Sequence, residues 1–156
     1  MKTFIKKNLD IIILIIFIAI VAGLDSLFVN LGMSWFNNLK TPKQWILNFV
    51  IPIVWTTIYL LFAIIMSILF KQNLVNKKTI WLGIINGILN NLWCLVFFTL
   101  QQLLLGAIII IINAFFATAL LIELAKIKKW YVNILWIYPI WIFIAPSLNI
   151  ALWILN

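Results

Sequence analysis

Five long apolar stretches, separated by short polar segments, make up most of this 156-residue chain. They run over residues 11–29, 45–70, 79–100, 103–124 and 130–155. Each has about 19 residues or more, which is the length that crosses a bilayer as a helix. Backbone groups in lipid must be hydrogen-bonded within their own segment, so these runs predict helices despite many β-branched residues. The pattern predicts an all-α integral membrane protein, a single transmembrane domain over 1–156 built as a five-helix bundle.

Charge is sparse and lies between the apolar stretches. Only 9% of the residues are charged, the mean hydropathy is +1.23, and the net charge is +8 with no arginine. Nine of the eleven lysines lie in residues 2–7, 71–78 and 126–129, and Lys40 and Lys43 lie on the other side. Because positive loops stay in the cytoplasm, we expect a cytoplasmic N-terminus and an external C-terminus in a bacterial cell membrane. Topology thus explains the lysines, and no nucleic-acid partner is expected.

The sequence lacks the groups on which most enzymes and metal sites depend. It has no histidine, and its one cysteine, Cys94, excludes an intrachain disulfide. There is no catalytic triad, paired-cysteine motif or phosphate-binding glycine loop. We therefore expect no metal and no required cofactor, and we expect binding chemistry rather than catalysis.

The second apolar stretch presents an aromatic face. At helical spacing, Trp55 and Tyr59 share this face with Trp45, Phe49, Pro52 and Thr56. Indole and phenol groups on one face are typical of a pocket wall for a flat ligand, and Trp35 in the preceding polar segment would cover that pocket. An interfacial aromatic belt explains Trp35 and Trp45 equally well, but Trp55 lies deeper in the apolar run.

The third stretch carries amides beside aromatic rings. Spacings of four, three and four residues place Asn86, Asn90, Trp93 and Phe97 on one face. Asn90 with Trp93 favours a ligand pocket. For Asn86 and for Asn113 of the fourth stretch, interhelical hydrogen bonding at roughly 0.6–2 kcal/mol per contact is the favoured role.

Small residues mark two contact faces. On the fifth stretch, Ala145 lies between Trp141 and Leu148 and leaves a concavity that a flat ligand could fill. On the third stretch, Gly83 and Gly87 form a GxxxG pair, which allows close approach of helices. This pair predicts a homodimer packed through the third helix, with packing inside the bundle as the alternative.

Two acids flank the apolar runs. Asp25 is expected near the far end of the first helix, where it reaches the interface. Glu123 is expected to form an ion pair with Lys126 at the end of the fourth helix. Since a proton-coupled transporter places a carboxylate in mid-membrane, these positions argue against coupled transport.

Four motifs in order resemble the translocator protein family (TspO), also called tryptophan-rich sensory proteins. They are Trp35-Phe36 with Leu39 and Pro42, Val54 to Tyr59, Leu89-Asn90 with Trp93 and Phe97-Phe98, and Trp141 with Ala145 and Leu148-Asn149. The resemblance covers most of the chain. It implies a five-helix bundle, commonly dimeric, with a pocket beneath the first loop that binds porphyrins and, in eukaryotic members, cholesterol. It also implies a proposed porphyrin-breakdown activity, for which Trp55 and Trp141 would be the tryptophans.

Three functions follow as hypotheses. The first is a membrane protein that binds a planar hydrophobic ligand, a porphyrin, with a sensory, transport or scavenging role. The second is a small-molecule or sterol-like lipid transporter, and the third is oxidative degradation of protoporphyrin. Without histidine, metal-free porphyrin is favoured over haem. The predicted ligand-binding residues are Trp35, Trp55, Tyr59, Asn90, Trp93, Phe97, Trp141, Ala145 and Leu148.

Overall fold

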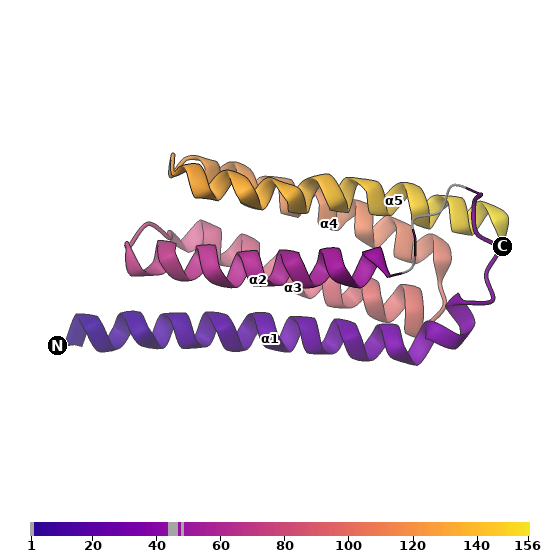
Figure 1. The fold of residues 1–156 in the computed structure, drawn as a ribbon, viewed down its shortest axis with the longest axis horizontal. Coiled ribbons are helices and arrows are strands. Elements are labelled where there is room, and N and C mark those ends of the chain that lie inside the picture. Colours follow the sequence, from indigo (N-terminus) through magenta and orange to yellow (C-terminus); the bar gives the residue numbers. More distant parts are fainter. Residues whose placement is uncertain (1, 44–46, 48) are drawn as a thin grey trace.

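The described part of the chain forms a bundle of five long α-helices (Figure 1). A computed structural model describes residues 2–43, 47 and 49–156, and the side chains from residue 8 onward. The helices are α1 (Lys2–Phe36), α2 (Val50–Lys71), α3 (Lys77–Cys94), α4 (Leu103–Ala125) and α5 (Ile137–Leu155). A π-helical turn, η1 (Leu95–Thr99), continues α3, and a 3-10 segment, η2 (Trp130–Trp136), leads into α5. Within the described residues, five helical spans are long and apolar enough to cross a membrane, which confirms the predicted all-α membrane fold.

The helices run up and down, with α3 near the middle of the bundle. It packs against α1 on one side and α4 on the other, α4 packs against α5, and α1 packs against α2. The N-terminus and the α2–α3 connection lie at one end of the bundle, and the α1–α2 connection and the C-terminus lie at the other (Figure 1). At that second end, the Asn156 side chain exchanges two hydrogen bonds with the Lys40 backbone. The lysine-rich and lysine-poor connections are therefore at opposite ends.

The first helix is longer than its apolar run. The sequence predicted a span over 11–29 followed by a loop from Asn30, but α1 continues without interruption from Lys2 to Phe36. At 1.5 Å per residue it is about 52 Å long, so it extends beyond the bilayer core. No proline or paired glycine interrupts residues 30–36, and Asn38 Nδ2 donates to Ser34 O at 2.9 Å just after the last turn. Trp35 therefore lies in a helix, not in a covering loop.

The second helix begins later than predicted. It starts at Val50, which places Pro52 in its first turn, where the missing N–H costs nothing and no kink results. Phe49 and Thr56 are exposed, so they do not belong to an inward aromatic face. Trp45, where the sequence predicted the start of this helix, lies outside the described residues.

The third helix changes geometry where its aromatic residues begin. Asn76 caps its start by accepting from the Thr79 backbone N–H at 2.8 Å. After Cys94 the hydrogen-bond pattern becomes π-helical through Thr99, and the chain turns into α4 at Gln101 and Gln102. Phe97 and Phe98, in this wider turn, are both buried.

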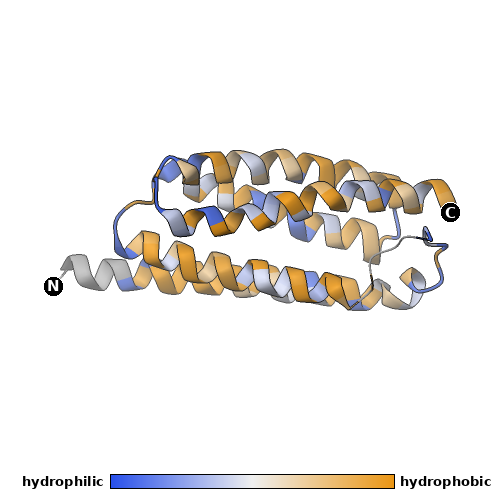
Figure 2. Ribbon diagram, turned by 45° about the horizontal axis from the view of Figure 1, so that its top comes forward, coloured by the Kyte–Doolittle hydropathy of each residue, from blue (hydrophilic) through white to orange (hydrophobic). Residues whose placement is uncertain are grey.

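The outer surface of the bundle is apolar, as a lipid-facing surface requires (Figure 2). Isoleucines and leucines of α1 such as Ile12, Ile16 and Leu31 are more than half exposed. At the lysine-rich end, Glu123 pairs with Lys126 at 2.7 Å and with Lys78 at 3.1 Å. The predicted ion pair of Glu123 with Lys126 is thus confirmed.

Candidate functional site

A ladder of aromatic rings runs along the inside of the bundle. The Trp55 ring lies 5.9 Å from Tyr59 and 6.1 Å from Trp93, centroid to centroid, with interplanar angles of 27° and 31°. The ladder continues from Trp93 to Phe97, whose ring centroids are 6.0 Å apart. Phe97 in turn makes a T-shaped contact with Trp35, with a centroid distance of 6.1 Å. Helical spacing in α2 and α3 brings these rings together because each helix repeats its inward position every three or four residues. The ladder extends from the middle of the bundle to the end that carries the α1–α2 connection.

A small cavity of about 40 Å³ lies beside this ladder, between α2, α3 and α5. Six of the nine predicted ligand-binding residues line it: Trp55, Trp93, Phe97, Trp141, Ala145 and Leu148. Ligand pockets for drug-sized molecules usually measure about 300–1,000 Å³, so this cavity holds no macrocycle without movement of its walls. Of the surrounding helices, α2 packs mainly on α1 and η2 rather than on α5.

One polar atom on this cavity's wall has no protein partner. The Trp141 indole N–H is buried and makes no hydrogen bond with any described residue. By contrast, the Trp93 indole donates to Asn149 Oδ1 at 3.1 Å. Buried donors are almost always paired, and an unpaired one costs about 1–3 kcal/mol. The Trp141 N–H is therefore available to a polar group on a ligand.

The other predicted residues lie elsewhere. Tyr59 and Asn90 line a second, larger cavity. The two cavities have only Trp55 in common among their lining residues. Trp35 lies in the last turn of α1, touches Phe97, and does not line either cavity. The structure thus divides eight of the nine predicted residues between two cavities that meet at Trp55, and it leaves Trp35 outside both.

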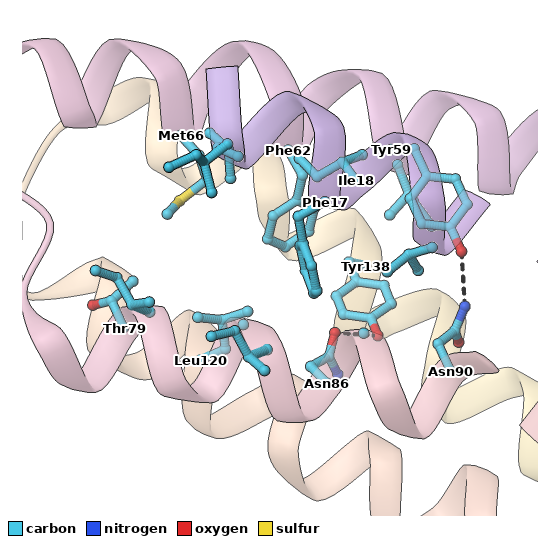
Figure 3. Close-up of a pocket in the computed structure, with 18 of the residues that line it drawn as sticks. Phe17, Ile18, Tyr59, Phe62, Met66, Thr79, Asn86, Asn90, Leu120 and Tyr138 are labelled. Carbon is cyan, nitrogen blue, oxygen red and sulfur yellow. Dashed lines mark hydrogen bonds between the residues drawn. The ribbon is translucent and has the colours of Figure 1, made fainter. Parts of the chain in front are cut away.

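The larger cavity measures about 290 Å³ and lies between α1, α2 and α3 (Figure 3). Its walls are mainly apolar, with Phe17, Phe62 and Met66 among them. Thr79 marks one end, near the start of α3, while Tyr59 and Asn90 mark the other (Figure 3). By the rise of α3 these ends are about 17 Å apart, so the cavity is long and narrow.

A continuous hydrogen-bond network crosses the centre of the bundle and takes a side chain from every helix. Asn90 Nδ2 donates to Asp25 Oδ2 at 2.6 Å and lies 2.8 Å from the Tyr59 hydroxyl. The network runs on from Asn90 through Asn113 and Asn86 to the hydroxyl of Tyr138, with donor–acceptor distances of 3.3, 2.6 and 2.8 Å. The predicted interhelical bonding of Asn86 and Asn113 is confirmed, and Asn90 serves both the network and the larger cavity.

The position predicted for Asp25 is wrong. It is only 8% exposed, and it lies eleven residues before the end of α1 rather than at the interface. Tyr59 donates to Oδ2 of its carboxylate, and Asn91 Nδ2 donates to Oδ1 at 2.5 Å. The error came from ending the first helix at residue 29. A carboxyl group at this depth does not count against coupled transport, contrary to the expectation from the sequence.

The glycine pair of α3 faces the inside of its own bundle. A Cβ at Gly87 would lie 2.8 Å from Cζ of Phe17, so this glycine allows α1 to approach α3 closely. Gly83 lines the larger cavity, and a Cβ there would meet nothing within 4 Å. The homodimer stays a prediction, and its proposed face is in contact with α1 at Gly87.

Some residues of the site were missed by sequence reasoning. Tyr138 is 3% exposed and joins both the network and the larger cavity. Its spacing of three and seven residues from Trp141 and Ala145 could have assigned it to the same inward face. Phe36 lines the small cavity, and only the true end of α1 reveals it. Among the described residues no cluster of metal-ligating side chains occurs.

Fold and site together define an integral membrane protein whose five helices surround an aromatic, cavity-containing centre. A sequence model of the TspO/MBR family matches residues 11–154. The chain therefore belongs to the TspO/MBR family. It is also similar to Protein CrtK of Rhodobacter capsulatus, with 28% identity over 130 residues that cover 79% of each chain.

Proposed function

We propose that this protein binds a planar hydrophobic ligand, a porphyrin, at the tryptophan-lined cavity between α2, α3 and α5. The observation that carries the proposal is the unpaired, buried N–H of Trp141 on the wall of a cavity with two further indoles, Trp55 and Trp93. Ring faces stack on a flat macrocycle, and the N–H donates to its polar edge. Membership of the TspO/MBR family supports the same ligand class.

Binding a macrocycle requires that the cavity open. Its volume of about 40 Å³ is far below that of a usual ligand site, so its walls must separate before a macrocycle enters. Displacement of α2 from α5 widens the gap between Trp55 and Trp141. Metal-free porphyrin fits the wall better than haem because no histidine is present to bind iron.

Replacing either tryptophan by phenylalanine tests this proposal. Trp55→Phe and Trp141→Phe keep most of the apolar area, but Trp141→Phe also removes the unpaired donor. We expect each to weaken protoporphyrin binding about tenfold, equivalent to about 1.4 kcal/mol, as measured by absorbance titration. Trp153→Phe is the matched control, because Trp153 is 46% exposed on the same helix as Trp141. Equal affinities for Trp141→Phe and Trp153→Phe would exclude the cavity as the site.

Filling the cavity is a second test. Ala145 is 7% exposed and lies on the cavity wall, so Ala145→Phe places a ring in the space that the ligand needs. We expect loss of protoporphyrin binding with an overpacking cost of about 1–3 kcal/mol in stability. Thermal unfolding in detergent separates the two effects. Binding that persists in a folded Ala145→Phe protein would place the porphyrin elsewhere.

The role that follows from binding is sensory, transport or scavenging. Transport gains support from Asp25, since a buried intramembrane carboxylate is typical of coupled transporters. Oxidative porphyrin degradation is the alternative activity. It would be lost in light-exposed Trp55→Phe and Trp141→Phe proteins, while much of their binding would remain.

We further propose a bacterial cell membrane as the location, with the lysine-rich end in the cytoplasm. Segregation of nine lysines to the end of the bundle that carries the N-terminus supports this orientation. A homodimer is part of the proposal. If it forms through α3, the partner must approach beside α1, because Gly87 already contacts Phe17.

A further inference from the structure

The carboxylate of Asp25 is buried among neutral groups. Both of its oxygens accept hydrogen bonds, from Tyr59 and Asn90 on Oδ2 and from Asn91 on Oδ1. Three donors directed at the two oxygens stabilise the ionised form of this carboxyl group. The ion pairs among the described residues, in contrast, both involve Glu123. When ionised, Asp25 places a negative charge in the middle of the bundle, and its hydrogen-bond partners there are uncharged.

A buried charge of this kind costs free energy until a cation approaches it. The larger cavity gives a cation room to do so. Tyr59 and Asn90 both bond the carboxylate and line the cavity, so the carboxylate lies directly behind this part of the cavity wall. In a low-dielectric interior, attraction between charges extends across such a wall.

The walls of this cavity end suit an organic cation. The rings of Trp55, Tyr59, Phe62 and Tyr138 line it, and aromatic faces attract ammonium groups, most strongly when the groups are desolvated. Asn86 and Asn90 also line it, and their side-chain oxygens accept from Tyr138 and Asn113. Beyond them the lining residues are apolar apart from Asp10 and Thr79. A ligand there needs a positively charged head and an apolar body.

We infer that the cavity between α1, α2 and α3 is a binding site for lipophilic amines, with Asp25 as the counter-charge. This site is separate from the tryptophan-lined cavity proposed for porphyrin, with which it shares only Trp55. An anionic ligand would be repelled by the same carboxylate. The two cavities therefore select ligands of opposite character.

The test compares two probes of one shape. Naphthylmethylamine is positively charged at neutral pH, and naphthylmethanol has the same aromatic body without charge. Binding of each to the full-length protein in phosphatidylcholine nanodiscs is measured by quenching of tryptophan fluorescence, with empty nanodiscs as the partition control. We expect the amine to bind at least about tenfold more tightly than the alcohol. Equal affinities in the wild-type protein would overturn the inference, whatever any variant does.

Variants then locate the charge and the cavity. Asp25→Asn keeps the shape and should reduce the amine to the affinity of the alcohol. Glu123→Gln, which removes an acid that lines neither cavity, should leave the preference unchanged. A preference that survives Asp25→Asn, or that disappears with Glu123→Gln, would contradict the assignment.

Gly83→Leu gives an independent answer if Asp25→Asn does not fold. Because nothing lies within 4 Å of a Cβ at Gly83, the leucine fills cavity space and should block both probes. Ala145→Phe, in the other cavity, should change neither affinity. If instead Ala145→Phe blocks the amine and Gly83→Leu does not, the amine site is wrong and the probes occupy the tryptophan-lined cavity. Failure of porphyrin binding alone leaves this inference intact.

Discussion

Gly32→Ala is expected to prevent stable folding of the bundle. Gly32 lies in α1 where the helix crosses the π-helical turn η1, and an added Cβ would fall on the backbone carbonyl of Phe98, within 2.9 Å of its Cα as well. Backbone atoms cannot move aside as a flexible side chain can. Thr99 also donates to the carbonyl of Phe28 at 3.1 Å, so separation of the helices would break this bond. We expect a loss of about 3 kcal/mol or more in the free energy of unfolding.

The matched control is Gly23→Ala, in the same helix. A Cβ at Gly23 meets nothing within 4 Å, and the residue is exposed. Alanine is favoured over glycine in helices by about 1 kcal/mol, so stability should stay equal or rise slightly. Denaturation by SDS, followed by circular dichroism in detergent, measures both variants. Wild-type stability of Gly32→Ala would show that α1 does not approach η1 as closely as described.

The same crossing shows what the sequence could not predict about the helices. Hydropathy gave their number and approximate places, because lipid requires long apolar spans. It could not give the ends of α1, since a helix continues into polar sequence wherever nothing breaks it. The π-helical turn at Leu95–Thr99 has no hydropathy signal, and it determines how Phe97, Phe98 and Gly32 meet.

The spacing of residues predicted which side chains share a face of a helix, but not which other helices and cavities that face meets. Trp141, Ala145 and Leu148 line one cavity together, as their spacing suggested. Asn90 and Trp93 share a face of α3, yet they line different cavities, because Trp55 of α2 lies between these spaces. Such a division depends on how helices pack side by side, and the sequence of one helix does not contain it.

Six of the described tryptophans fall into two groups, one near the helix ends and one inside the bundle. Trp81, Trp130 and Trp153 are 63%, 76% and 46% exposed and lie near the helix ends, as an interfacial belt would. Trp93 is 6% exposed, and Trp55 and Trp141 line the cavities. Composition alone could not separate the groups, but depth in the apolar run did so for Trp55.

Asn90→Leu is expected to be the most damaging change in the polar network. Asn90 is 3% exposed and links Asp25 of α1, Tyr59 of α2 and Asn113 of α4. Each hydrogen bond between membrane helices contributes about 0.6–1.7 kcal/mol, and a buried charge that loses a donor adds to the cost. We expect a loss of about 2–4 kcal/mol in the free energy of unfolding. Asn133→Leu, at an exposed position of η2, should change it by less than about 0.5 kcal/mol.

A double-mutant cycle with Asp25→Asn distinguishes loss of packing from loss of a donor to the charge. If Asn90 acts chiefly by stabilising the Asp25 carboxylate, Asn90→Leu should cost less stability in a protein that already carries Asp25→Asn. The double variant should then be more stable than the sum of the single effects predicts, by about 1 kcal/mol or more. Additive effects would show instead that Asn90 stabilises the bundle only through its contacts with Tyr59 and Asn113. The carboxylate would then not be held as an anion by this network, and the counter-charge assigned to Asp25 would lose its structural basis.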